Sequence, residues 1–364
     1  MKILYYIYGL NIGGAESFIY NVVDAINTEL YHIDFVLQIE NNQNKRLIEL
    51  LRKKGCKIYI ISSFFKKPVK SSIELRKLAI NYDAIHVHIN ALINISPILI
   101  GRLIGIPVII HSHNTSSNKG FTGNLLHKIN RLIWNKKIYR VACGVEAGRW
   151  MFGKKKFDVI DNGINLQKYC YSYKYRKEIR SRYGIGIDDI VIGNVGRLVK
   201  AKNHAFMLDC FQKFQERYNN AWLILVGDGE LKKELLAKVQ QLGIKNVIFA
   251  GNVSDTNKYY SAFDCMLFPS VFEGMPFTLI EAQASGVPIV ASDIITRDVN
   301  ITKNIEYVSL NEDIAVWCEI ISNTMVLGNM REKNLNIMEG SIYDIATSVK
   351  KLEEIYKSLI GRRE

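Results

Sequence analysis

The stretch that decides the fold is PSVFEGMPFTLIEAQASGVP, residues Pro269–Pro288. It follows the short apolar run Cys265–Phe268, and apolar residues at helical spacing fill its second half. It therefore predicts a strand, a loop and a helix. Pro276 suits the first turn of this helix, because the N–H that proline lacks would be unpaired there. Gly274 allows a ligand to approach the backbone, and the free N–H groups of a helix start favour an anion such as a pyrophosphate.

Two acids flank the start of the predicted helix. Glu273 lies in the loop before it, and Glu281 lies inside it, eight positions later. Each carboxylate can therefore reach one end of an extended ligand, where it can accept hydrogen bonds from the paired hydroxyls of a sugar or a ribose. The alternative is a core helix with two surface acids, which the spacing alone would favour. The strand–loop–helix context favours the ligand site instead.

A second junction of strand and helix carries two cations. Residues 194–204 are NVGRLVKAKNH, in which Arg197 and Lys202 follow Gly196. Arginine offers a fork of donors to phosphate oxygens and lysine a point charge, so both can hold a pyrophosphate and stabilise a leaving diphosphate. The alternative is a pair of solvated surface cations.

Short β-rich runs alternate with helical stretches in both halves of the chain. The expected strands are 3–8, 33–37, 58–61, 84–88, 108–111 and 141–143, then 191–194, 223–226, 247–249, 265–268 and 289–291. The expected helices are 16–26, 45–54, 72–81, 97–103 and 123–134, then 204–217, 231–242, 277–285, 314–326 and 345–359. This alternation predicts two α/β domains, each a doubly wound parallel sheet covered by helices, with ligands at the carboxyl ends of the strands.

A length of 364 residues suits two domains. We expect a first domain over residues 1–165, a second over 166–344 and a final helix over 345–364. The apolar stretch Ala91–Ile110 is interrupted by two prolines and an arginine, so it predicts a helix, a turn and a buried strand, not a spanning helix. The N-terminus predicts a first strand and no signal peptide.

The pattern of cysteines indicates the compartment in which the protein works. The six cysteines are dispersed without a C-x-x-C pair, which indicates a reducing cytosol and no cysteine metal site.

Positive charge is concentrated in the first half of the chain. Residues 1–165 hold 23 Lys+Arg against 11 Asp+Glu, a net charge of +12, whereas the remainder carries +1. This asymmetry predicts an anionic partner for the first half, either nucleic acid, anionic lipid or a phosphorylated substrate. The alternative is a basic surface that only aids solubility.

Two further patterns in the first half leave alternatives open. The pairs His86/His88 and His111/His113 lie at probable strand ends, each pair on one face. They fit polar contacts to a ligand, a structural role or a zinc site, although neighbouring acid or cysteine ligands are lacking. The stretch Leu125–Arg140 interleaves apolar and basic residues, as in a helix on an anionic membrane or an ordinary half-buried helix.

Together these motifs resemble retaining glycosyltransferases of family 4, which have the GT-B fold, and the resemblance spans nearly the whole chain. The motifs that carry it are Glu273 with Glu281, Gly196-Arg197 with Lys202-Asn203, Gly13–Glu16, and Asn162-Gly163. Ser292–Val299 and Tyr343–Ile345 are similar to the exopolysaccharide and capsule branch. The resemblance implies two Rossmann-like domains facing a central cleft, with acceptor binding in the first domain and nucleotide-sugar binding in the second. It also implies that the final helix crosses back to the first domain.

The resemblance implies roles for individual residues. Glu273 would bind hydroxyls of the donor sugar, Glu281 the ribose, and Arg197 with Lys202 the pyrophosphate. His113 would contact the donor sugar near the reacting centre. Asn252 and Val253 would lie beside the base, and Gly14 would approach the donor from the first domain. The backbone of Gly274, Met275, Pro276 and Phe277 would hold the phosphate and the sugar. Asn162 and Gly196 are the other implied donor-binding residues. Met275 and Pro276 depart from the family's commoner aromatic and glycine, and a Gly-Gly-x-x-Glu loop after Asp293 is absent, so the identity of the donor is not implied.

These observations predict a hexosyltransferase that moves a sugar, with retention of configuration, from a nucleotide-diphosphate sugar to a polyprenyl-diphosphate-linked saccharide in exopolysaccharide or capsule synthesis. No second carboxylate is placed as a nucleophile, which favours a front-face mechanism assisted by the leaving diphosphate. No metal or other cofactor is expected, because Arg197 and Lys202 neutralise the leaving group. We expect a cytoplasmic protein, peripheral at the inner face of the cell membrane, that binds anionic lipid through its basic first domain.

Three rival functions remain open. A sugar-nucleotide epimerase or a phosphorylase would use the same fold. A nucleic-acid-binding protein is suggested only by the isoelectric point of about 9.3, and the sequence holds no helix-turn-helix, RNA-binding aromatic motif or metal finger. A degenerate glycosyltransferase serving as a partner subunit would not need the intact Glu273 and Glu281.

Overall fold

The computed structural model describes residues 1–10, 14–38, 44–116, 120–133, 138–273, 275–326 and 331–360. The chain divides into two compact units. The first comprises Met1–Ile164 with Ile342–Glu364, and the second comprises Asn165–Ser341. No helix among the described residues is long and apolar enough to span a bilayer.

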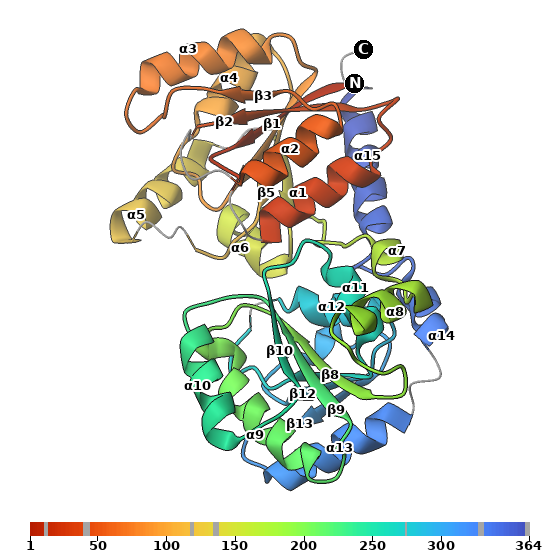
Figure 1. Cartoon of the computed structure of the whole chain (residues 1–364). Helices are drawn as coiled ribbons and strands as arrows, with labels where there is room; N and C mark the ends of the chain where they lie inside the picture. Colours follow the sequence, from red (N-terminus) through yellow and green to blue (C-terminus); the bar gives the residue numbers. More distant parts are fainter. Residues whose placement is uncertain are drawn as a thin grey trace. The chain divides into compact units, whose positions relative to one another are not determined.

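The first unit is a seven-stranded parallel sheet in the order β3-β2-β1-β4-β5-β6-β7 (Figure 1). Its strands are β1 (Lys2–Ile7), β2 (His32–Leu37), β3 (Ile58–Ile60), β4 (Ala84–Ile89), β5 (Val108–Ser112), β6 (Ile138–Ala142) and β7 (Asp158–Val159). Its helices are α1 (Gly14–Ala25), α2 (Lys45–Lys53), α3 (Pro68–Ala79), α4 (Ser96–Ile104), α5 (Gly120–Asn130), the 3₁₀ turn η1 (Arg131–Ile133), α6 (Val145–Phe152) and α15 (Ile345–Ile360). The strand order reverses between β1 and β4, the point where open α/β sheets bind ligands.

Helix α15 closes one face of the first sheet. Its buried residues, among them Leu352 and Tyr356, share a hydrophobic core with β1, β2 and α1. The start of α15 lies against the chain at Gly163, where a Cβ atom would come within 2.6 Å of the Ile345 nitrogen. Asn21 donates to the Gly163 carbonyl at 3.1 Å. Gly163 is therefore required for this close approach, because any side chain there would collide with the start of α15.

The second unit repeats the design with a six-stranded parallel sheet in the order β10-β9-β8-β11-β12-β13. Its strands are β8 (Ile190–Val195), β9 (Ala221–Val226), β10 (Val247–Gly251), β11 (Cys265–Phe268), β12 (Ile289–Ser292) and β13 (Ile305–Val308). Its helices are α7 (Leu166–Tyr169), α8 (Tyr173–Arg182), η2 (Lys200–Lys202), α9 (His204–Gln215), α10 (Lys232–Leu242), α11 (Thr256–Ala262), α12 (Phe277–Ala284), η3 (Arg297–Val299), α13 (Ile314–Val326) and α14 (Arg331–Met338). Here the strand order reverses between β8 and β11.

The two doubly wound parallel sheets confirm the predicted fold class. Differences lie in the ends and in elements with weak periodicity. Helix α3 begins at Pro68, four residues before the predicted start, with proline in its first turn. Strand β6 begins at Ile138 instead of Val141, although Tyr139 and Arg140 give that segment a polar appearance. The sequence also missed α6, α7, α11, α14, β7 and β13.

Candidate functional site

In the second unit, close contacts between backbone segments join the loops that follow β8, β9 and β10. Gly227 has φ of +135°, and a Cβ atom there would lie 2.0 Å from the carbonyl oxygen of Gly196. The Gly227 amide donates to the Gly251 carbonyl at 2.9 Å. Asn252, which is exposed, and the half-buried Val253 follow Gly251 directly, so both lie at the carboxyl edge of the sheet.

An ion pair stands at the same edge, between the segment after β8 and the loop after β11. The Nζ atom of Lys202 donates to Oε1 of Glu273 at 2.6 Å, and the two side chains are 16% and 13% exposed. Phe268, the last residue of β11, supports the ammonium group, which lies 5.0 Å from its ring centroid. Asn203 follows Lys202 with φ of +55°, which fixes the turn into α9. The structure thus brings together two predicted residues that are 71 positions apart.

Lys202 and Glu273 are mutually satisfied and largely shielded from water, so a ligand at this edge would meet a preorganised charge pair. The ammonium group can bind a phosphate oxygen on one side while the carboxylate orients it and retains an acceptor oxygen for a hydroxyl. Arg197, close by in the chain, is exposed. Its guanidinium is therefore accessible to an anion.

Helix α12 begins at Phe277, with Pro276 as its N-cap and not in its first turn as predicted. Pro276 is buried and Met275 is exposed, whereas Gly274 lies outside the described residues. The hydroxyl Oγ1 of Thr278, in the first turn of α12, is buried without a hydrogen-bond partner. Such an atom beside the helix start is suited to a phosphate or hydroxyl group, because a buried polar atom gains free energy from a partner.

Glu281 lies one turn into α12 and accepts two tyrosine hydroxyls. Tyr169 donates to Oε1 at 2.9 Å and Tyr260 donates to Oε2 at 2.6 Å. Burial raises the pKa of the Glu281 carboxyl, and the two hydroxyl donors oppose that shift. The tyrosines hold the carboxylate in one orientation, and each oxygen keeps a lone pair for a further donor.

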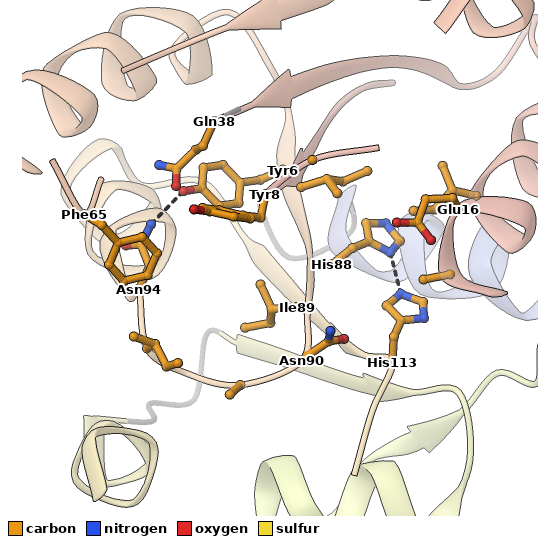
Figure 2. Close-up of a pocket in the computed structure, with 16 residues that line it drawn as sticks. Tyr6, Tyr8, Glu16, Gln38, Phe65, His88, Ile89, Asn90, Asn94 and His113 are labelled. Carbon is orange, nitrogen blue, oxygen red and sulfur yellow. Dashed lines mark hydrogen bonds between the residues drawn. The ribbon is translucent and has the colours of Figure 1, made fainter. Parts of the chain in front are cut away.

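The first unit contains a pocket of about 250 Å³ at the carboxyl ends of its central strands. Figure 2 shows Tyr6, Tyr8, Gln38, Phe65 and Asn94 on one side and Glu16, His88 and His113 on the other. Gly14, the first residue of α1, precedes two pocket residues, Ala15 and Glu16; Gly13 lies outside the described residues. The pocket stands where the strand order reverses, the position expected for a ligand.

Aromatic rings and amides give the pocket a mixed lining. Tyr8 and Phe65 are both partly exposed and meet edge to face, with ring centroids 5.9 Å apart. Asn94 donates to the Tyr6 hydroxyl at 2.7 Å. The Gln38 amide donates to Ser71, whereas its buried oxygen Oε1 has no partner. Exposed rings together with an unsatisfied acceptor suit a ligand with both apolar faces and hydroxyls, as a sugar has.

The four histidines of the predicted pairs form one cluster on a single face of the first sheet, in which His86, His88 and His111 are buried and His113 is half-buried. Nδ1 of His88 and Nε2 of His113 share a hydrogen bond of 2.8 Å. Nδ1 of His86 shares one of 2.7 Å with the Tyr356 hydroxyl of α15. Burial lowers the pKa of His113 to about 4 and those of the other three well below their ordinary value. The cluster is therefore neutral at pH 7.

The cluster does not have the geometry of a metal site. Possible ligand atoms of His86, His88 and His111 lie within 4.8 Å of one another. However, the rings of His86 and His111 are stacked, with an interplanar angle of 10°, and those of His86 and His88 with one of 24°. Because the lone pair of an imidazole lies in the ring plane, nearly parallel rings do not converge on one ion as tetrahedral ligands do. Polar contacts and packing within the first unit therefore explain the histidine cluster better than a metal site does.

Comparison with known proteins shows the family to which the chain belongs. A model described as "Glycosyl transferases group 1" matches residues 175–315, which include Lys202, Glu273 and Glu281. EpsF of Bacillus subtilis (strain 168), described as a glycosyltransferase, is 30% identical over 98% of this chain and 96% of its own length. The chain belongs to the group 1 glycosyltransferases.

Two further proteins, one compared by sequence and one by structure, are similar to this chain over most of its length. An Escherichia coli UDP-Gal:alpha-D-GlcNAc-diphosphoundecaprenol alpha-1,3-galactosyltransferase is 25% identical over 81% of this chain and 80% of its own. HepE of Anabaena, solved in complex with UDP, superimposes with a TM-score of 0.74 at 19% identity, covering 98% of this chain and all of HepE. The likeness to HepE shows that the two chains share the GT-B fold.

Several residues of this glycosyltransferase's candidate site were not anticipated from its sequence. They are Tyr169 and Tyr260, which hold Glu281, and Tyr6, Tyr8, Gln38, Phe65 and Asn94, which line the pocket. Two of the pocket residues, Tyr8 and Gln38, carry a signal, since each directly follows a parallel strand. The tyrosines that hold Glu281 carry no such signal, because their positions depend on the packing of α7 and α11.

Proposed function

We propose that the chain transfers a hexose from a nucleotide-diphosphate sugar to a saccharide linked to a polyprenyl diphosphate, with retention of configuration and without a metal. The observation that carries the proposal is the Lys202–Glu273 pair at the carboxyl edge of the second sheet. It combines a cation for phosphate with a carboxylate for sugar hydroxyls within one contact. Arg197 and the start of α12 provide further anion-binding groups.

The donor would lie along the edge of the second unit. Lys202 and Arg197 would bind the diphosphate, Glu273 the hydroxyls of the sugar, and the tyrosine-held Glu281 the ribose. Asn252 and Val253 would lie beside the base. HepE of Anabaena, which shares the fold, was solved with UDP bound, which supports a nucleotide ligand.

Transfer with retention would proceed on one face of the sugar. The bond between the anomeric carbon and the diphosphate breaks as the acceptor oxygen bonds to the same face, and the acceptor proton passes to a departing phosphate oxygen. Lys202 and Arg197 would stabilise the negative charge that develops on this diphosphate. The two cations supply the neutralisation that a metal ion otherwise provides.

The acceptor saccharide would bind in the pocket of the first unit. Tyr8 and Phe65 offer rings against which the apolar face of a sugar can stack, and Gln38 offers an unsatisfied acceptor. The Escherichia coli relative is named for a lipid-diphosphate acceptor, which supports a lipid-linked saccharide here. The similarity of Ser292–Val299 and Tyr343–Ile345 to the exopolysaccharide and capsule branch supports a role in surface polysaccharide synthesis. A lipid-linked acceptor would place the chain, as a peripheral protein, at the inner face of the cell membrane.

The deciding experiment measures thermal stabilisation by nucleotide sugars and then release of nucleoside diphosphate. A ligand that binds only the folded state raises the melting temperature, so one donor of a panel is expected to stabilise the chain, and Lys202→Met to abolish the effect. With that donor, diphosphate release should require a saccharide acceptor. Conversion of the sugar without any acceptor would indicate an epimerase instead. Stabilisation by nucleic acid and by none of the nucleotide sugars would refute the proposal.

A further inference from the structure

Helix α5 and the turn η1 present an apolar stripe to the outside of the first unit. Phe121, Leu125, Ile129 and Leu132 are 83%, 49%, 52% and 84% exposed. Their spacing of four, four and three residues places them on one side of the helix. Figure 1 shows α5 at the periphery of its unit. An ordinary half-buried helix would cover such residues, so four exposed apolar side chains on one side of a helix indicate an interaction surface.

The opposite side of α5 holds the loop that lines the pocket. Nδ1 of His127 accepts the Leu92 amide at 3.0 Å, and Asn130 donates to the Leu92 carbonyl at 2.7 Å. Trp150 of α6, stacked on the His127 ring, donates to the Asn90 carbonyl at 2.9 Å. His127 and Asn130 are buried, so the two faces of α5 are sharply different. One face is exposed and apolar, and the other fixes pocket residues 90–94.

Positive charge accumulates around this helix. Residues 120–156 contain nine Lys and Arg and one acid, Glu146, so this segment accounts for +8 of the net charge of +13. The structure brings some of these cations together. The Arg131 side chain donates to the Trp150 carbonyl and lies against Gly153 at the end of α6. Nearby Arg131 and Arg140 add to burial in lowering the pKa of Lys155. An exposed apolar stripe on a segment with this excess of positive charge suits an anionic bilayer, whose lipid chains can take up the apolar residues and whose phosphates attract the cations.

We propose that the stripe Phe121–Leu125–Ile129–Leu132 is the surface by which this chain lies on an anionic lipid bilayer. Because α5 also holds residues 90–94, docking would fix that side of the pocket close to the lipid surface. The inference rests on the proposed function for its purpose, since a saccharide on a lipid anchor reaches no further from the bilayer than its diphosphate and sugars allow.

Flotation of the full chain with vesicles tests the surface directly. The chain should float with vesicles of phosphatidylglycerol and phosphatidylcholine, and much less with phosphatidylcholine alone or at high salt. The double variant Phe121→Asp, Leu132→Asp should lose at least about tenfold in partitioning, because it removes apolar contact and adds charge repelled by the lipid. Val69→Asp is the matched control, since Val69 is 73% exposed on α3. This control should float as wild type does.

Three results would overturn the proposal. One is that wild type fails to float with anionic vesicles, and another is that the double variant floats as well as wild type. The third is a wild-type dimer in gel filtration that the double variant converts to monomer, because the stripe would then pair two copies of the chain. Near-identical melting temperatures show that the variants are folded, as expected for exposed positions.

Nucleotide-sugar binding separates this inference from the proposed function. The double variant should bind the donor as wild type does, because its changes lie in the first unit outside the donor residues. If wild type binds the donor but does not float, only the proposed membrane surface is refuted. If it floats but binds no donor, only the proposed transfer reaction is refuted. Asn130→Ala should keep flotation while raising the KM for a vesicle-borne acceptor, whereas an unchanged KM would contradict the role of α5 in the pocket.

Discussion

Acidification should destabilise the first unit more steeply than its surface charges would suggest. Its four clustered histidines are neutral in the fold, with the pKa of His113 lowered to about 4 by burial and those of His86, His88 and His111 lowered well below their ordinary value. In the unfolded chain each titrates near about 6.5. The unfolded state therefore binds more protons below that pH, so the free energy of unfolding falls as pH drops from about 6.5 toward 4.

The size of the effect follows from proton linkage. Between pH 7.5 and pH 5 the protonation of each histidine in the unfolded state should lower the free energy of unfolding by about 2 kcal/mol, and the four together should lower it by about 8 kcal/mol. A whole domain is stable by only about 5–15 kcal/mol. Burial raises the pKa of the Asp161 carboxyl, so this group binds a proton more readily in the folded state. Its protonation therefore offsets part of the loss of stability on acidification. The first unit should thus lose most of its stability by about pH 5.

Urea unfolding followed by circular dichroism at a series of pH values measures the effect. The slope of the unfolding free energy should approach about 5 kcal/mol per pH unit near pH 5.5. His111→Gln removes one titrating ring, so its loss between pH 7.5 and pH 5 should be about a quarter smaller than that of wild type. A pH-independent first unit, or a variant whose loss equals that of wild type, would refute the burial of these rings in neutral form.

Three further predictions concern single residues. Gly227→Ala should lower the free energy of unfolding by more than about 3 kcal/mol, because the added Cβ would lie 2.0 Å from a carbonyl oxygen. The control Gly243→Ala, whose Cβ would meet nothing within 4 Å, should lower it by about 1 kcal/mol. Equal melting temperatures of the two variants would contradict this prediction. Tyr260→Phe should weaken donor binding about tenfold by releasing one oxygen of Glu281, as titration calorimetry would measure, and unchanged affinity would show that this carboxylate does not bind the donor. Tyr8→Ala should raise the acceptor KM about tenfold with donor affinity unchanged, whereas an unchanged KM would remove Tyr8 from the acceptor site.

The fold could be predicted where the sequence carries strong local signals. Strand Cys265–Phe268 and helix Ile314–Val326 match the prediction to the residue, since one is a continuous buried run and the other is strongly apolar. Strand β13 was missed because it is a four-residue edge strand that exposes Glu306. Helix α6 was missed because it starts after Gly144, without a side-chain cap.

The candidate site could be predicted residue by residue but not as a set of contacts. Lys202 and Glu273 were both expected at the donor, but their direct pairing depends on the parallel order of β8 and β11. Glu281 was expected to face a ribose, and the structure adds Tyr169, which is 112 positions away in the chain. Such contacts depend on tertiary packing, which local periodicity does not encode.

Titration calorimetry of one nucleotide sugar into wild type, Lys202→Met, Glu273→Gln and the double variant tests the central claim most directly. Each single variant should lose at least about tenfold in affinity. Because the two side chains share a hydrogen bond of 2.6 Å, their effects should be coupled, with the double variant losing less than the two losses combined. Wild-type affinity in either single variant would contradict a donor site built on this pair.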